Sequence, residues 1–317
     1  MMKMHDYCNE FVNAWLEGKE VEIPEFLYKY RPFDEHSFDM LENEYIYLCK
    51  ARWLDDPSEC KATYDLDDYY NIETGCVKSR AIDLILDYLR PYSTPQHFEI
   101  MRRLVNSVAT PGGEISGSRL LMVAIDMQKC VSGINVAPFI NYIRDIPERL
   151  DKPEIQELVK TLFHKAKSAR EEMGICSLSE HSNSPEMWED YADGSSGYCI
   201  EYHTKGYKRS GEIFPVSYTD RRNTDIVFAI LAAMIGKLVQ ELSNGEMVTD
   251  KSQYFSLFLT KNTKWQHQKE WRIIGNAGEK AKAPPIKTMY VGRNAKPENA
   301  ERIKKFCLER GIGFIQR

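Results

Sequence analysis

Apolar and polar residues alternate along segments at both ends of the chain, whereas apolar residues in the middle recur at helical spacing. FLYKYR (residues 26–31) and YIYLCK (residues 45–50) have the period of two that is typical of strands. Between about residues 79 and 172, successive segments carry apolar residues at i, i+3 and i+4. The pattern therefore predicts strands near the N-terminus and a central block of helices.

The second half of the chain returns to strand patterns. Strands are predicted in GICSLSE, GYCIEYH, EIFPVSY, WQHQKEWRIIG, IKTMYVG and GFIQR, and helices at about residues 223–242 and in PENAERIKKFCLERG. Two further short helices are expected, one over residues 5–18 and one in DEHSFDMLENE, where Asp34 or Ser37 provides the cap. These elements predict an α+β fold.

The order of these elements predicts three regions. Residues 1–78 would hold an N-terminal helix and the first half of a β core, residues 79–172 a helical insertion, and residues 173–317 the second half of the core with a C-terminal helix and strand. The helical insertion would have to leave the core and return to it. It is therefore a candidate surface for a protein partner.

Composition narrows the class of protein. A net charge of −5 over 317 residues argues against nucleic-acid binding by bulk electrostatics. The eight cysteines contain no C-x-x-C pair, so we expect reduced thiols that are mostly buried. The N-terminus lacks the pattern of a signal peptide, and we find no apolar run of membrane-spanning length. We therefore expect a cytoplasmic protein without a membrane segment.

Two dense stretches hold the candidate chemistry. If WQHQKEWRIIG is a strand, Gln268, Glu270 and Arg272 share one face. Glu270 could then lie in a cleft as an acid, a base or an acceptor for a ribose hydroxyl. Alternatively, Glu270 and Arg272 form an ordinary ion pair. In MWEDYADGSSGYCIEY, Trp188 and Tyr191 could stack on a planar ligand or simply pack a helix against a strand.

Other familiar sites are not indicated. The seven histidines show no metal-ligand spacing, and the chain has neither G-x-G-x-x-G nor G-x-x-x-x-G-K-[ST]. No G-x-S-x-G nucleophile motif is present. We therefore predict no metal site and no Rossmann or P-loop nucleotide site.

Several segments occur in the order and spacing of a bacterial family. They are LYKYRPFDEHSFDML, LDDP, ICSLSEHSNSPEMWEDYADGSSGYCIEY, TKWQHQKEWRII and IKTMYVG. In this order they resemble the DUF2971 family from Leu27 to the C-terminus, less well across the helical block. The positions that match are Asp56, Pro57, Trp188, Tyr191, Ala192, Gly197, Trp265, Glu270 and Arg272. The chain departs from the family in the segment Trp53-Leu54-Asp55-Asp56-Pro57, where members often carry F-N-D-P-F, and at His267 and Gln268, where members carry a tyrosine and a glutamate.

The resemblance implies a layout similar to the ADP-ribosyltransferase fold, with a split β core and a large helical insertion. Lys29 or Arg31 would then hold NAD, and Tyr45 or Tyr47 would border its nicotinamide. Trp188, Tyr191 and Arg272 are further candidates for the NAD site. Glu270 would be the catalytic carboxylate that stabilises positive charge on the ribose as nicotinamide leaves.

Three functions follow from this resemblance. The first is an ADP-ribosyltransferase-like or NAD-cleaving effector of a toxin or antiphage system, acting on an unknown macromolecular acceptor or on water. The second is a ligand- or partner-binding module without turnover, in which Trp188, Tyr191 and Trp265 form an aromatic pocket. The third is a nucleic-acid-processing effector, against which the acidic composition stands.

Overall fold

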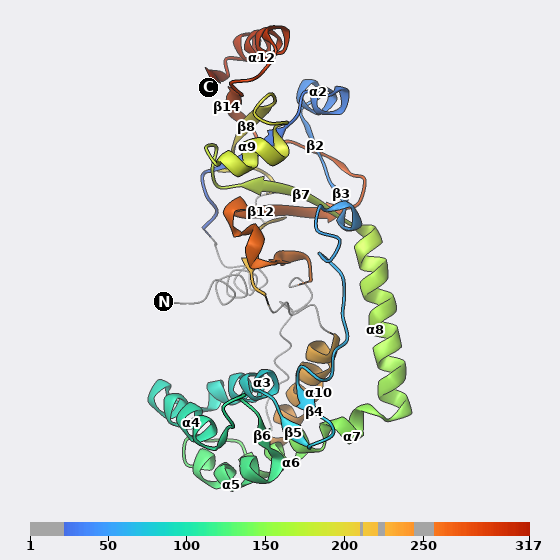
Figure 1. Cartoon of the computed structure of the whole chain (residues 1–317), viewed down its shortest axis with the longest axis vertical. Helices are drawn as coiled ribbons and strands as arrows, with labels where there is room; N and C mark the ends of the chain where they lie inside the picture. Colours follow the sequence, from blue (N-terminus) through green and yellow to red (C-terminus); the bar gives the residue numbers. More distant parts are fainter. Residues whose placement is uncertain (1–21, 210–211, 221–225, 244–256) are drawn as a thin grey trace. The chain divides into compact units, whose positions relative to one another are not determined.

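The computed structural model describes residues 22–209, 212–220, 226–243 and 257–317 (Figure 1). Two compact units divide the chain. Unit 1 comprises Met1–Lys61, Lys167–Asn223 and Lys251–Arg317, and unit 2 comprises Ala62–Ala166 and Thr224–Asp250. The helix expected over residues 5–18 lies outside the described residues.

Unit 1 is built on an eight-stranded sheet. Its order is β15-β14-β8-β1-β7-β12-β9, with β3 also paired to β7. The strands are β1 (Phe26–Arg31), β3 (Cys49–Lys50), β7 (Met173–Ser179), β8 (Tyr198–His203), β9 (Ile213–Pro215), β12 (Glu270–Asn276), β14 (Ile286–Val291) and β15 (Gly313–Gln316). Strands β14 and β15 are parallel, and the other neighbours are antiparallel.

The sheet is split in its middle, between β1 and β7. Strand β1 pairs with β8 along its whole length and β7 pairs with β12 along its whole length, but β1 and β7 share a single pair, Tyr28 with Ser179. Beyond that pair the Lys29 ammonium donates to the Ser177 carbonyl at 2.7 Å. Between β1 and β7, beyond the Tyr28–Ser179 pair, a side-chain hydrogen bond therefore takes the place of backbone ladder hydrogen bonds.

Smaller elements complete unit 1. They are α2 (Glu35–Glu42), β2 (Tyr45–Tyr47), η1 (Ala51–Trp53), α9 (Pro185–Tyr191), β10 (Ser217–Tyr218), β11 (Thr260–Lys261), η4 (Thr263–Gln268), β13 (Lys280–Lys282) and α12 (Pro297–Arg310). The Asp34 side chain caps α2 by accepting from the Ser37 amide. Gly311 ends α12 at a φ of 65°. The expected cap at Asp34 and the helix expected in PENAERIKKFCLERG are confirmed.

Three expected strands are interrupted. YIYLCK forms β2, which pairs with β13, and β3, which pairs with β7. EIFPVSY likewise divides into β9 and β10. The first half of WQHQKEWRIIG is the 3-10 helix η4, and Lys269 turns the chain into β12 at a φ of 42°. The expectation of one continuous strand is wrong here, because Asn262 caps a helical turn by accepting from the Lys264 amide.

Unit 2 is helical around a second core. Its helices are α3 (Ser79–Leu89), η2 (Arg90–Tyr92), α4 (Pro95–Val108), α5 (Gly117–Gln128), α6 (Val136–Arg144), α7 (Ile146–Leu150), the first part of α8 (Pro153–Glu172) and α10 (Ile226–Ser243). The short strands β4 (Tyr70–Asn71), β5 (Cys76–Val77) and β6 (Ile115–Ser116) form a small sheet. Unit 2 thus differs from the expected insertion, because it begins at Ala62 and takes α10 from later in the chain.

Helix α10 corrects the expectation about apolar runs. It is 18 residues long and apolar, so by length and composition it could span a membrane. Its buried residues, Ile226, Val227, Ile230, Leu231, Ala232, Ile235 and Val239, belong to the core of unit 2. Packing in that core accounts for its apolar character.

The described cysteines are all free thiols. Cys60, Cys130, Cys176, Cys199 and Cys307 are buried, and Cys49 and Cys76 are half-buried. The expectation of reduced and mostly buried thiols is confirmed for this part of the chain.

Gly197 allows two segments of unit 1 to approach closely. A Cβ atom at this position would lie 2.2 Å from the Arg31 carbonyl oxygen. Since that atom belongs to the backbone of β1, Gly197→Ala is expected to lower the free energy of unfolding by about 1–3 kcal/mol. Urea denaturation measures the change. Gly112→Ala is the control, because its Cβ would meet nothing nearer than 3.8 Å, and an equal loss in both variants would contradict the prediction.

Candidate functional site

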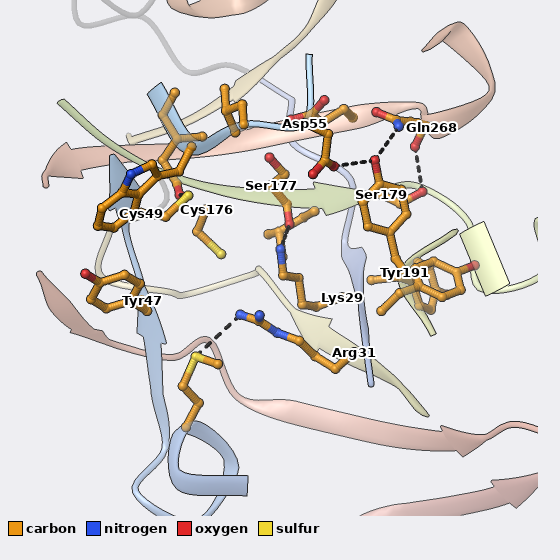
Figure 2. A pocket seen from close by; sticks show the side chains of 18 of the residues that line it. Lys29, Arg31, Tyr47, Cys49, Asp55, Cys176, Ser177, Ser179, Tyr191 and Gln268 are labelled. Atoms are coloured by element: carbon orange, nitrogen blue, oxygen red, sulfur yellow. Dashed lines mark hydrogen bonds between the residues drawn. The ribbon is translucent and has the colours of Figure 1, made fainter. Parts of the chain in front are cut away.

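A cavity of about 690 Å³ opens beside the split in the sheet of unit 1. Strands β1 and β7 provide its floor, and β2, the segment after β3, α9 and the start of β12 provide its walls. Figure 2 shows the side chains of Lys29 and Arg31 reaching into it from β1. The split therefore places side chains where a continuous sheet would have closed the gap.

Lys29 and Arg31 give the cavity two cationic groups. The Lys29 ammonium donates to the Ser177 carbonyl, and the Arg31 guanidinium donates to the Met40 sulfur at 3.4 Å. Within the described residues neither group forms an ion pair with a carboxylate. Burial lowers the pKa of Lys29. A methionine sulfur is a weak acceptor, so the guanidinium retains donors for an anionic ligand.

Aromatic side chains line the opposite part of the cavity. Tyr45 and Tyr47 come from β2, and the Tyr45 hydroxyl donates to Asp39. Trp53 follows in η1 and is 55% exposed, which is unusual for a tryptophan. These rings offer flat apolar surface to a planar group of a ligand.

A chain of hydrogen bonds crosses the cavity wall at Tyr191. The Gln268 amide donates to the Tyr191 hydroxyl at 2.8 Å, and that hydroxyl donates to Asp55 Oδ2 at 2.8 Å (Figure 2). The Ser179 hydroxyl donates to the Gln268 backbone carbonyl at 2.7 Å. Burial, reinforced by the Asp55 carboxylate, raises the pKa of Tyr191, so the hydroxyl keeps the proton that it donates.

Glu270 lies at the edge of the cavity within a buried ionic cluster. Arg272 Nε is 2.8 Å from Glu270 Oε1, and Lys261 Nζ is 3.0 Å from Glu270 Oε2. Glu59 completes the cluster by pairing with both cations. We name Glu59, Lys261, Glu270 and Arg272 the buried ionic cluster. Its two carboxylates and two cations balance in charge.

The geometry of the buried ionic cluster holds Glu270 in its charged form. Burial favours the neutral acid, but the charges of Arg272 and Lys261 outweigh it and lower the pKa of Glu270 well below its ordinary value. Lys261 lies 3.0 Å from Glu59 Oε1 as an ion pair without hydrogen-bond geometry. Both oxygens of Glu270 are used within the cluster.

The structure brings most of the expected site residues together. Six of the eight line the cavity, namely Lys29, Arg31, Tyr45, Tyr47, Tyr191 and Glu270. The same wall of the cavity includes Gln268, where this chain departs from the family pattern. Among the described residues, no three His, Cys, Asp or Glu side chains gather as metal ligands.

Two of the expected site residues, Trp188 and Arg272, do not line the cavity. Trp188 is 4% exposed and packs edge-on against Tyr30, with its indole N–H donating to the Ser182 carbonyl. Arg272 is fully buried in the ionic cluster. The packing interpretation of Trp188 and the ion-pair interpretation of Arg272 therefore describe these two residues.

Sequence reasoning missed several members of the site. Lys261 and Glu59 were not singled out, and Asp55 was noted only within a departure from the family pattern. Nothing in the spacing links Glu59 to Arg272, which lies 213 positions later. The available signal was LDDP, whose two acidic residues contact Tyr191 and Trp265.

The segment that runs from Met187 in α9 to Ile273 in β12 matches a known family. Residues 187–273 match the DUF2971 family. That family is described as a protein of unknown function. No curated protein and no solved structure matches the chain.

The DUF2971 match includes part of the cavity wall. Tyr191, Lys261, Gln268 and Glu270 fall within it, as does Arg272 of the buried ionic cluster. The cationic strand β1 and the loop that holds Asp55 precede it. The likeness expected from Leu27 to the C-terminus is therefore shown for residues 187–273.

Proposed function

We propose that the cavity binds NAD or a related nucleotide. Lys29 and Arg31 bind its phosphates, and the aromatic wall at Tyr45, Tyr47 and Trp53 receives a planar ring. One observation supports this best: the Arg31 guanidinium reaches into a cavity of about 690 Å³ beside Lys29, and neither side chain forms an ion pair with a carboxylate in the described part of the chain. An arginine fork suits the paired oxygens of a pyrophosphate.

Comparison of the two arginines supports the proposal. Arg272 uses its donors on Glu270, on Glu59 and on the Phe258 carbonyl, so its charge is compensated within the protein. Arg31 has the Met40 sulfur as its partner. A cation that the fold does not compensate is more readily explained by a ligand.

The proposed fold type is ADP-ribosyltransferase-like. It is supported by a split sheet in which β1 carries the cationic residues, β7 borders the split and β12 carries Glu270 at the same cavity. The α+β class itself is plain from the elements of the chain.

A second candidate function is cleavage of NAD. Glu270 lines the cavity and stays ionised, so it would place a negative charge near a ribose that becomes positive as nicotinamide leaves, although Lys261 and Arg272 bind both of its oxygens in the free protein. The acceptor of the ADP-ribose, whether water or a macromolecule, defines whether the protein is a glycohydrolase or a transferase. An effector that depletes NAD in a toxin or antiphage system would follow from this activity.

Replacing Arg31 tests nucleotide binding. Arg31→Met keeps much of the side-chain length but removes the guanidinium, and we expect NAD affinity to fall about 10-fold to 100-fold because a charge-assisted contact is lost. Isothermal titration calorimetry measures the dissociation constant. Arg293→Met removes an exposed arginine that does not line the cavity and is the matched control. Equal affinity in wild type and Arg31→Met would refute the proposal.

Release of nicotinamide tests cleavage separately from binding. Purified protein is incubated with NAD, with and without cell extract, and free nicotinamide is measured by chromatography. Glu270 also balances two buried cations, so Glu270→Gln is compared with Glu270→Gln/Lys261→Met. The double variant keeps one carboxylate and one cation, and its cluster is therefore neutral. We expect both variants to bind NAD and release no nicotinamide. Saturable binding by the wild type without release would instead favour the binding-module interpretation.

A further inference from the structure

Asp55 lines the same cavity, and one of its two carboxylate oxygens can accept a hydrogen bond from a ligand. Its Oδ2 accepts from the Tyr191 hydroxyl, while Oδ1 has no hydrogen-bond or ion-pair partner among the described residues. The side chain is exposed, so a ligand can reach it. Glu270 differs, because Arg272 and Lys261 use both of its oxygens.

Tyr191 holds the Asp55 carboxylate in place. The hydroxyl that donates to Asp55 accepts from the side-chain amide of Gln268, which is 3% exposed and whose backbone carbonyl accepts from the Ser179 hydroxyl. An exposed aspartate on an ordinary loop would lack such support. This arrangement fixes Asp55 Oδ2, and with it the direction of Oδ1.

The cavity therefore contains basic and acidic side chains that form no ion pair among the described residues. Lys29 and Arg31 have no carboxylate partner and Asp55 has no cationic partner, and no ion pair joins Asp55 to either cation within the described chain. Groups of opposite charge in one cavity complement a ligand that carries an anionic part and a separate hydrogen-bond donor.

We infer that Asp55, oriented by Tyr191, is the carboxylate that contacts the ligand and selects for a hydrogen-bond donor on it. The inference rests on the proposed nucleotide binding and adds the ligand class: a phosphate-containing molecule with an amide, amino or hydroxyl donor on its other part. Inorganic pyrophosphate satisfies the cationic half alone. NAD satisfies both halves.

The test compares these two ligands in Asp55→Ala. Calorimetric titration of the full chain is expected to show NAD affinity about tenfold weaker than wild type, because a hydrogen bond to a charged group is lost. Pyrophosphate affinity is expected to stay equal or to become tighter, because a negative charge leaves the cavity. Asp190→Ala removes an exposed aspartate of α9 outside the cavity and should change neither affinity.

The outcomes separate this inference from the proposed function. If wild type binds both ligands and Asp55→Ala binds NAD as tightly as wild type, the role of Asp55 is wrong while nucleotide binding stands. Parallel weakening of NAD and pyrophosphate would also overturn it, because a general loss of the cavity explains that result. If wild type binds neither ligand, the proposal of nucleotide binding is wrong, and so is the role of Asp55 that depends on it. Weaker NAD binding by Asp55→Ala with equal or tighter pyrophosphate binding supports the role of Asp55.

Discussion

Arg272→Met is expected to lower the free energy of unfolding by about 3–5 kcal/mol, the range typical of breaking a buried ion pair from one side. Arg272 is fully buried and contacts both Glu59 and Glu270. Methionine fills a similar length without charge. The variant therefore leaves two buried carboxylates that share the single cation of Lys261.

The loss arises from uncompensated charge more than from lost attraction. A buried ion pair contributes little net stability when its desolvation is counted, but an isolated buried carboxylate is costly. Glu59 is 0% exposed and Glu270 is 4% exposed, so water cannot replace the guanidinium without opening the fold. The Phe258 carbonyl also loses its donor.

Denaturant unfolding of three variants tests this account. Arg272→Met is compared with Arg293→Met, which removes an exposed arginine, and with Arg272→Met/Glu59→Gln, which restores one carboxylate to one cation. We expect the double variant to be more stable than Arg272→Met. A loss below about 1 kcal/mol in Arg272→Met, or no recovery in the double variant, would contradict the role of the buried ionic cluster.

Local patterns in the sequence predicted most of the elements. Alternation identified β1 and β8, helical spacing identified α3, α4, α5, α6 and α8, and capping residues fixed the ends of α2 and α12. Each of these signals depends on neighbours within a few residues. The interruption at Lys269 was not predictable in this way, because a non-glycine residue with positive φ has no strong sequence signal.

The candidate site was predicted in part, for a physical reason. The resemblance pointed to Lys29 and Arg31, and strand spacing together with the resemblance pointed to Glu270; the structure places all three at one cavity. The pairing of Glu59 with Arg272 depends on the tertiary fold, since no local pattern relates residues so far apart. The role of Asp55 depends on the hydroxyl of Tyr191, 136 positions away. Sequence could name charged candidates but could not tell which charges the fold compensates.

Glu270→Gln is expected to have the second large effect, a loss of about 3–5 kcal/mol at neutral pH. Glutamine keeps the shape but leaves Arg272 and Lys261 with the single charge of Glu59. Because the folded protein lowers the pKa of Glu270, its contribution is present above the unfolded-state pKa of about 4.3 and is lost as pH falls through the folded-state value. The stability difference between wild type and variant should therefore shrink as the pH is lowered below about 4.

Urea unfolding at pH 7 and at pH 3.5 measures this dependence, with Glu270→Gln/Lys261→Met as the charge-balanced comparison. We expect the double variant to recover much of the stability at pH 7, since one buried cation then faces one buried carboxylate. A Glu270→Gln variant as stable as wild type at pH 7 would mean that Glu270 does not hold the cluster together. Its carboxylate would then have no structural role, which would strengthen the case that it acts on the ligand. A large loss that the double variant recovers shows that Glu270 serves the fold, and any loss of nicotinamide release must then be judged in the double variant.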